Sequence, residues 1–479
     1  MGDDDALERR SVVAGAHGGV VPFARSWVLS LGPPAILSKS IGSFWVQRAL
    51  GPAALWHDPC LEVRVAGDHD RGMALLGLAI DPDLTDQTDL IDRLSAAWHA
   101  GSLDDHLDRL NGRYVCAYWN ADGFWLQSDA VAMRGIYWHA HEPVAGGNPR
   151  LVAEAVDDVR PSYYGQRETS PKVWTTPGRR TQMLNVWRLG PNVELELRGR
   201  TARRVGPVPH TPSTVDDAAD KVRDEAGRFL DQLCRTERPI VASLTAGFDS
   251  RVTLALTRRT AERMSWFTYQ LERPTMQADV DRDVTVATEL AARFGLDHRV
   301  LDLSDSWPTK AQAAIFARNT HRQHGRQVSV KYAATFPLDA IHVRSNLYEL
   351  GRFYYGAFPI DAPIAEWMAT RLLKGRSVDA SVIADYSDQL HFSDYAAVPE
   401  EYAVQDMFYW ETRLGGWMQN MLIESDVAFD TVIPINSRRI IRTLLSVPTK
   451  QRAEWETFHA IIRGAWPEVL EHPINGRRI

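Results

Sequence analysis

The alternation of apolar and polar residues changes its period near the middle of the chain. Residues 240–243, Ile-Val-Ala-Ser, form an apolar run that leads into a turn of small residues, and an Asp-Ser pair follows at 249–250. From 252 to 256 apolar residues have helical spacing. The pattern predicts a strand, a tight loop and a helix. In such a unit, backbone N–H groups and the positive end of the helix face one point, which suits phosphate.

The side chains of this loop fit phosphate chemistry. Gly247 can adopt a positive φ and let an anion approach the backbone, and Ala246 is nearly as small. Asp249 has no reason to lie beside a phosphate unless a cation bridges them, so we predict that it binds Mg²⁺. Thr245 and Ser250 supply hydroxyl donors. The alternative is a plain turn in which Asp249 and Ser250 only cap the helix. The loop is not a Walker loop, because no Gly-Lys-Ser/Thr follows.

A period of two marks strands in the first part of the chain. The runs 116–120 and 124–129 alternate and are separated by an Asp-Gly turn, which is a strong hairpin signal. Residues 190–197 indicate the closing hairpin of this part. We therefore expect the strands of the first part to pair antiparallel.

A proline-rich segment divides the chain. Three prolines lie within 205–213, and an acidic helix start follows at Asp216 and Asp217. A length of 479 residues fits two domains of ordinary size with insertions. We expect a first domain over 1–204, a linker over 205–214 and a second domain over 215–479.

The surroundings of the loop resemble a known family. Residues 245–250 resemble the S-G-G-x-D-S pyrophosphate loop of ATP pyrophosphatases, specifically the synthetase domain of the asparagine synthetase family. A strand over 265–270, a helix that carries Asp283 and Glu289 and ends at Phe294-Gly295, and a return strand over 297–303 follow in the family's order. The resemblance implies bound ATP and Mg²⁺, with Asp249 as the metal ligand. The implied nucleotide contacts are Leu244, Thr245, Ala246, Gly247, Phe248, Asp249, Ser250, Tyr269 and Ser345.

The first half is similar to the class II glutamine amidotransferase domain of that family. The hairpin, a turn at 134–138 and the segment 151–155, which stands in place of a family strand, occur in the family's order. The resemblance covers roughly residues 100–475. It implies an α/β protein with two parts. The first is an N-terminal antiparallel β-sandwich with flanking helices, Ntn-hydrolase-like, and the second is a C-terminal parallel-sheet ATP-pyrophosphatase domain with added helices.

One departure from the family bears on the nitrogen donor. Glutaminases of that class use an N-terminal cysteine, whose thiolate attacks the amide while the α-amine takes the proton. Here Met1 precedes Gly2 and an acidic start that we expect to be flexible, and Cys60, Cys116 and Cys234 are interior. Either the module has lost its hydrolase role or the mature terminus differs. We favour a scaffold domain, as in β-lactam synthetases and lasso-peptide cyclases, so glutamine is not the nitrogen donor.

The segment 340–352 matches the family by order, with substitutions. It takes the place of a strand and an S-G-x-G-S-D-E loop, in which Ser345 and Glu349 fit as a loop donor and an acidic group. The family's glycines and its second Mg²⁺-binding Asp are missing, and Arg344 and Arg352 could offset phosphate charge. The alternative is a strand leading into a helix whose arginines are solvated or paired with Glu349.

The end of the chain matches the family by shape. Residues 429–435 are similar to a family strand, and 438–445 have helical spacing. The family then places a lysine four residues before an arginine, but counting back from Arg463 leads to His459. His459 could act as a partly protonated substitute and, with Glu349, is a predicted catalytic residue. The alternative is an ordinary surface histidine.

Composition limits the partners and the compartment. A formal charge of −7 gives no electrostatic footprint for nucleic acid. Hydrophobic residues at 44% and charged residues at 24% are typical of a soluble globular protein. Three cysteines without C-x-x-C spacing indicate a reducing compartment and no zinc site. With no membrane-spanning apolar stretch and no recognisable signal peptide, we expect a cytoplasmic protein.

Three functions compete at this stage. The first is an AMP-forming ligase that joins a small-molecule or peptide carboxylate to an amine, which comes from ammonia, a second substrate or the same molecule. The second is a catalytically impaired scaffold. The third, an enzyme that adenylates a nucleobase, is disfavoured by the acidic balance. Aromatic residues near Trp410, Trp417 and Tyr354-Tyr355 either line a substrate pocket or belong to the core. A homodimer is left open.

Overall fold

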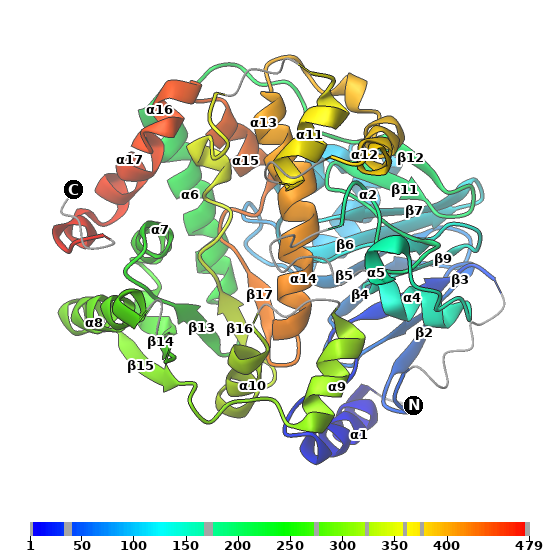
Figure 1. Cartoon of the computed structure of the whole chain (residues 1–479), viewed down its shortest axis with the longest axis horizontal. Coiled ribbons are helices and arrows are strands. Elements are labelled where there is room, and N and C mark those ends of the chain that lie inside the picture. The colour runs from blue at the N-terminus through cyan, green and yellow to red at the C-terminus, as the bar shows by residue number, and fades with distance from the viewer. Residues whose placement is uncertain are drawn as a thin grey trace.

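The computed structural model of the chain describes residues 3–32, 41–166, 176–272, 277–320, 325–357, 362–373 and 378–474. Its N-terminal half holds two six-stranded antiparallel sheets, and its C-terminal half holds one five-stranded parallel sheet surrounded by helices (Figure 1). This is the expected α/β fold class.

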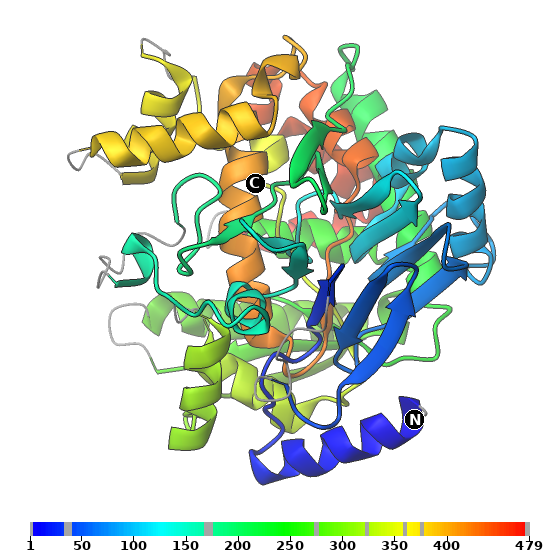
Figure 2. The ribbon, with the colours of Figure 1, turned by 90° about the vertical axis from the view of Figure 1, so that its right-hand side faces the viewer.

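The chain begins with a helix rather than a flexible segment. Helix α1 (Asp3–Ala16) starts with acidic residues, whose charge complements the positive end of the helix. The expectation of a flexible acidic start is therefore wrong for Asp3 onward, and Met1 and Gly2 lie outside the described residues. Arg10 is fully buried and donates to Asp58 at 2.9 Å, which anchors the helix beneath the strands (Figure 2).

The two antiparallel sheets face each other as a sandwich. Trp27 and Leu55 of the first sheet share a buried core with Leu76, Val115 and Phe124 of the second. The first sheet has the order β10 (Val186–Arg188), β8 (Tyr137–His139), β9 (Val144–Gly146), β1 (Trp27–Ser30), β3 (Ala53–His57) and β2 (Val46–Leu50). The second has the order β12 (Thr201–Arg204), β11 (Val193–Glu196), β7 (Gly123–Ser128), β6 (Asn111–Asn120), β5 (Gly72–Ile80) and β4 (Val63–Gly67).

Helices cover the outer faces of the sandwich. Leu94 of α2 (Leu90–His99) and Leu107 of α3 (Leu103–Arg109) pack with Tyr114 on the second sheet. Leu151 and Val152 of α4 (Pro149–Ala155) pack with Val28 on the first. The short helix α5 (Tyr163–Gln166) follows. The predicted N-terminal sandwich with flanking helices is thus confirmed.

Both predicted hairpins form, but one predicted strand is wrong. β6 and β7 pair from Val115 opposite Ser128 to Asn120 opposite Gly123, and β11 of the 190–197 segment pairs with β12. The segment 151–155, by contrast, lies in helix α4. Asn148 accepts hydrogen bonds from the N–H groups of Arg150 and Leu151, and proline occupies the first turn. These two signals begin a helix, and the residues that follow favour it.

The proline-rich segment 205–213 lies between β12 and α6. β12 ends at Arg204, and α6 (Val215–Leu233) begins after Thr214, whose side chain accepts from the N–H of Asp217 at 3.2 Å. Asp216 and Asp217 supply the acidic first turn. The domain boundaries expected at 204 and 215 stay predictions.

All strands of the C-terminal sheet are parallel, and the order in which the chain adds them reverses at β13 (Ile240–Ser243). Its strand order is β15 (Asp297–Asp302), β14 (Ser265–Gln270), β13, β16 (Ile341–Val343) and β17 (Asp430–Val432). The chain moves outward from β13 to β15 and then returns to the other side of β13. The carboxyl ends of β13 and β16 therefore form a topological switch point, where ligands bind in open parallel sheets.

Helices surround this sheet, and α14 runs through the middle of the molecule between it and the N-terminal strands (Figure 1). The helices of the C-terminal half are α6, α7 (Phe248–Leu256), α8 (Gln277–Phe294), α9 (Lys310–Asn319), α10 (Arg326–Thr335), α11 (Ile364–Leu373), α12 (Ala380–Phe392), α13 (Val404–Met407), α14 (Gly415–Ser425), α15 (Arg438–Leu445), α16 (Thr449–Ala453) and α17 (Glu456–Ala465). A π-helical segment, η5 (Phe408–Leu414), precedes α14. Among the described helices, none combines the length and hydropathy needed to cross a membrane.

Buried charge pairs join the two halves. Arg113 of β6 forms a two-pronged pair with Asp426, with one N–O distance of 2.8 Å, and Arg134 lies 2.6 Å from Asp430 of β17. Because broken pairs would leave uncompensated charges in the interior, these contacts fix how the halves sit.

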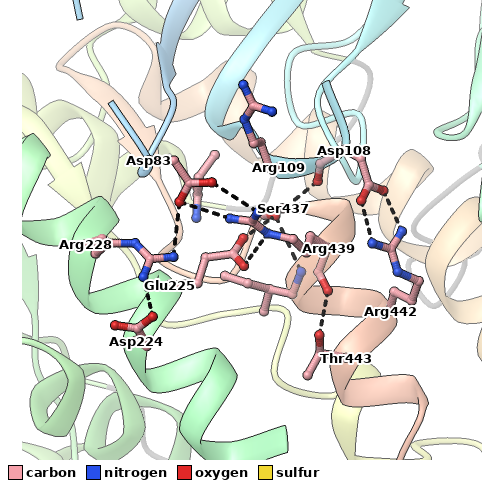
Figure 3. Close-up of polar contacts among 12 residues, drawn as sticks. Asp83, Asp108, Arg109, Asp224, Glu225, Arg228, Ser437, Arg439, Arg442 and Thr443 are labelled. Carbon is pink, nitrogen blue, oxygen red and sulfur yellow. Dashed lines mark hydrogen bonds and ion pairs between the residues drawn. The ribbon is translucent and has the colours of Figure 1, made fainter. Parts of the chain in front are cut away.

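A second set of charged contacts reinforces this junction. Figure 3 shows Arg439 and Arg442 of α15 pointing toward Asp83 and Asp108 of the N-terminal half. Arg439 also lies 2.6 Å from Glu225 of α6, and Arg442 lies 2.7 Å from Asp108. Helix α15 is thereby held both to α6 and to the N-terminal half.

Candidate functional site

The loop between β13 and α7 lies at the switch point. Leu244 extends the sheet pairing by donating its N–H to Phe267 at 2.9 Å, and α7 begins after Gly247. No side chain caps this helix, so its first-turn N–H groups point to the loop without a capping acceptor. The alternative in which Asp249 and Ser250 cap the helix is wrong, since both lie inside its first turn.

Gly247 is required by space rather than by backbone conformation. Its φ is −73°, outside the left-handed region that glycine favours. A Cβ at this position would lie 3.2 Å from the hydroxyl of Thr245, closer than the usual contact. The loop therefore has a small residue at the point where the hydroxyl of Thr245 turns inward.

The two loop hydroxyls brace the loop itself. Ser250 is 3% exposed, and its Oγ donates to the carbonyls of Thr245 and Gly247, at 2.9 and 3.0 Å. Thr245 Oγ1 accepts from the N–H of Gly247 at 3.2 Å. The predicted role of Thr245 and Ser250 as phosphate donors remains a prediction, and the structure gives them a first role in holding the loop's shape.

One backbone amide of the loop already holds an oxyanion. The N–H of Ala246 donates to Asp283 Oδ1 of α8 at 2.8 Å. Burial raises the pKa of Asp283, and the hydrogen bond from Ala246 opposes that rise. The contact shows that the loop N–H can donate to an anionic oxygen.

Asp249 sits between an arginine and a second carboxylate. Both terminal nitrogens of Arg352 lie 3.2 Å from its oxygens, and Arg352 also lies 3.6 Å from Glu349. Burial and the negative charge of Glu349 raise the pKa of Asp249 to about 7, while Arg352 lowers it. Arg352 also lies over the ring of Trp455 at 4.8 Å, so a third side chain holds the guanidinium in place. The pairing of Arg352 with Glu349 confirms part of the alternative interpretation of this segment.

The turn after β16 positions these groups without the family's glycines. Leu347 has φ of 74°, in the left-handed region where glycine is favoured. Tyr348 is fully buried and shares a hydrogen bond of 2.8 Å with Thr253 of α7. The turn continues into a 3₁₀ segment, η3 (Leu350–Arg352). Strain at a single backbone position is common at ligand sites.

Two other predicted residues lie at the same edge of the sheet. Ser345 follows β16, and its Oγ is buried without a hydrogen-bond partner among the described residues. Tyr269 is near the carboxyl end of β14, opposite Leu301, and is 38% exposed. Parallel strands thus bring the segments of Leu244, Tyr269 and Ser345 to one edge.

His459 contacts the first residue of α7, next to the loop. It lies on α17, and its ring contacts Phe248 at 5.0 Å between centroids. Burial, with the nearby Arg463, lowers its pKa. A lowered pKa reduces the protonated fraction at neutral pH and so weakens the idea of a cationic substitute for lysine.

The carboxylates fit a magnesium ion only together with phosphate. Among the described residues, no group of three or more His, Cys, Asp and Glu side chains is arranged to hold a metal. Asp249 and Glu349, both beside Arg352, are nonetheless the acidic pair at the switch point. Mg²⁺ is commonly held by one or two carboxylates plus substrate phosphates and water, so this donor set suits it in that setting.

The cysteines are poor nucleophiles in this fold. Cys116 and Cys234 are buried, and burial raises the pKa of each thiol. Burial and the charge of Asp58 raise the pKa of Cys60 to about 11. Since the thiolate is the reactive form, none of these three side chains is poised to attack an amide.

Some site residues were missed by sequence reasoning. Trp455 contacts Arg352, and burial together with the nearby charge of Glu349 raises the pKa of Tyr409. Neither belongs to a motif, and each comes from a distant segment. No signal in the sequence pointed to them.

Comparisons with known proteins give weak similarities. No protein-family model matches the chain, and no curated protein matches it. The NH3-dependent NAD synthetase from Campylobacter jejuni, solved with a nitrate ion, is 15% identical, covers 38% of this chain and 98% of its own, and has a TM-score of 0.20. NMN synthetase from Francisella tularensis is 13% identical, with 44% and 94% covered and a TM-score of 0.21.

A third similar structure covers more of this chain. Glutamine phosphoribosylpyrophosphate amidotransferase from B. subtilis, complexed with ADP and GMP, is 9% identical, with 72% and 74% covered and a TM-score of 0.23. These scores do not place the chain in any of the three families.

Proposed function

We propose that the chain is an ATP-dependent ligase that forms an amide bond and releases AMP and diphosphate. The observation that carries the proposal is the uncapped β13–α7 loop at the switch point, with the Asp249–Arg352–Glu349 group beside it. A helix N-terminus at such a switch point suits phosphate binding. Arg352 can offset phosphate charge, and the carboxylates can hold a cation or accept a proton.

The proposed reaction has two steps. A substrate carboxylate oxygen attacks the α-phosphorus of ATP, and diphosphate leaves to give an acyl-adenylate. An amine nitrogen then attacks the acyl carbon, the bond to AMP breaks, and the amine loses one proton. The loop amides and Arg352 favour the charge that develops on the phosphate oxygens. Glu349 is the proposed acceptor of the amine proton.

Magnesium belongs to this proposal as a cofactor of ATP. Asp249 would hold it, with Glu349 as the second carboxylate at hand. The ion would neutralise phosphate charge and favour departure of diphosphate. Arg352 would stay over Trp455, and its ion pair with Asp249 would weaken.

The amine does not come from glutamine in this proposal. The raised pKa values of the Cys60, Cys116 and Cys234 thiols support this part of the proposal. Ammonia, a second substrate or an amine of the same molecule then supplies the nitrogen. The substrate is a small-molecule or peptide carboxylate, and the proposed location is the cytoplasm.

A second candidate is a scaffold that keeps the fold without turnover. Two contacts favour it: Arg352 occupies Asp249, and Asp283 occupies the Ala246 amide. In that case the polar groups of the site are paired with each other, and the chain does not bind ATP.

Exchange of labelled pyrophosphate into ATP separates the two candidates. The full chain is incubated with Mg²⁺, ATP and a panel of carboxylic acids. We expect acid-dependent exchange that Asp249→Asn abolishes. Asp302→Asn, an exposed carboxylate at the end of β15, is the matched control and should leave exchange unchanged. Exchange that survives Asp249→Asn would overturn the ligase assignment at this loop, and absence of ATP binding by the wild-type chain would support the scaffold.

A further inference from the structure

Two arginines beside the candidate site have no acidic partner among the residues that the structure describes. Arg344 follows β16, and its Nε donates to Asn346 Oδ1 at 2.5 Å while Nη2 contacts Met421 Sδ at 3.3 Å. Arg413 of η5 lies over the ring of Trp417 at 5.2 Å. Within the described residues neither guanidinium makes an ion pair. Arg352, also half-buried near the switch point, is in contrast paired with Asp249 and Glu349.

One helix face brings the two arginines together. Trp417 and Met421 are four residues apart on α14, so their side chains lie on the same face, one turn from each other. Arg413 contacts the first and Arg344 the second. Both guanidiniums therefore lie along one stripe of α14, next to the carboxyl end of β16.

The acidic side chains of these elements are occupied elsewhere. Glu411 of η5 lies 2.7 Å from Arg204, and Glu424 of α14 lies 3.4 Å from Arg326. Neither turns to the stripe that Arg344 and Arg413 share. Half-buried cations with no carboxylate partner among the described residues favour an anion from outside the chain.

Two neighbouring side chains add a hydroxyl group and an apolar surface. Ser345 Oγ is buried with no partner among the described residues and adjoins Arg344. Trp417 is partly buried and adds an apolar wall. Two guanidiniums, a hydroxyl and an aromatic face suit a carboxylate on an apolar stem, because guanidinium and carboxylate can pair through two parallel hydrogen bonds.

We propose that this stripe binds a second carboxylate of the acyl substrate, so that the ligase acts on dicarboxylic acids. This inference rests on the proposed function for its catalytic meaning, while the binding itself does not require ATP. One carboxylate would lie at the switch point near the β13–α7 loop, and the other would pair with Arg344 and Arg413. The arginines then select the substrate and do not take part in bond formation.

Binding of matched acids tests this subsite without ATP. Calorimetry is done on the full chain with glutarate, adipate and pimelate, and with the monocarboxylates valerate, hexanoate and heptanoate of the same lengths. We expect at least one dicarboxylate to bind more tightly than its monocarboxylate counterpart. Arg344→Gln and Arg413→Gln should each weaken that binding by about ten- to a hundredfold. Arg344→Lys should fall between wild type and Arg344→Gln, because it keeps the charge but loses the planar fork.

The control and the ATP arm separate this proposal from its alternatives. Arg259→Gln removes an exposed arginine that pairs with Asp231 and should change nothing. Mg²⁺-ATP affinity should be unchanged in Arg344→Gln and Arg413→Gln. A loss of ATP affinity with unchanged acid binding would assign the arginines to the triphosphate and overturn the proposal. So would equal binding of mono- and dicarboxylates, or no binding of either. Failure of wild-type ATP binding alone would instead contradict the ligase function.

Discussion

Arg352 forms an ion pair with Asp249 in which both nitrogens of the guanidinium lie 3.2 Å from the carboxylate. The pair joins the first turn of α7 to the segment after β16, across the switch point of the parallel sheet. It brings the predicted metal ligand, the predicted acidic group Glu349 and a cation to one place. The chemistry proposed for the chain depends on this meeting.

The raised pKa of Asp249 predicts a pH-dependent cost in stability. Its pKa is about 7 in the fold against an ordinary value of 3.8, so between these values the folded state holds a proton that the unfolded state releases. The free energy of unfolding therefore falls as pH rises through this window. Asp249→Asn removes this dependence.

Urea unfolding of wild type and Asp249→Asn at pH 5 and pH 8 measures the effect. We expect the variant to gain stability relative to wild type on going to pH 8. A difference between the two proteins that does not change with pH would contradict the raised pKa.

The internal hydrogen bonds of Ser250 predict a structural role for this residue. Ser250→Ala removes a buried hydroxyl that serves the carbonyls of Thr245 and Gly247. We expect a loss of about 1–3 kcal/mol in the free energy of unfolding, because buried carbonyls lose a donor. Ser381→Ala, at an exposed position in the first turn of α12, should change it by less than about 0.5 kcal/mol. Equal effects in denaturant titrations would show that the loop does not depend on this hydroxyl.

The buried pair between Arg113 and Asp426 predicts that the two halves depend on each other. Arg113→Ala leaves the carboxylate of Asp426 buried without its partner, which typically costs about 3–5 kcal/mol. Arg259→Ala breaks an exposed pair and should cost no more than about 1 kcal/mol. Thermal unfolding compares the two variants. A similar small cost for both would mean that the junction of the halves does not rely on this pair.

Local patterns predicted the parts of the fold that are encoded locally. The strand before residue 244, the helix after it and the Asp122-Gly123 hairpin all follow from short periodicities and turn residues. The strand expected at 151–155 failed because the family pattern was preferred over two local signals, Asn148 as helix cap and Pro149 in the first turn. Capping chemistry decided the outcome.

The candidate site was predictable only in part. The loop and Asp249 carry a motif, but the partner of Asp249 lies 103 residues away, and the strand order of the parallel sheet decides that they meet. Trp455 has no signature at all, since its contact with Arg352 arises from the packing of segments that lie far apart in the sequence.

Calorimetric binding of Mg²⁺-ATP to wild type, Asp249→Asn and the control Asp302→Asn tests the central claim most directly. The account predicts that wild type and Asp302→Asn bind Mg²⁺-ATP alike and that Asp249→Asn loses at least about tenfold in affinity, as expected when a charge-assisted contact is removed. The same affinity in all three proteins, or no binding by the wild-type chain, would contradict it.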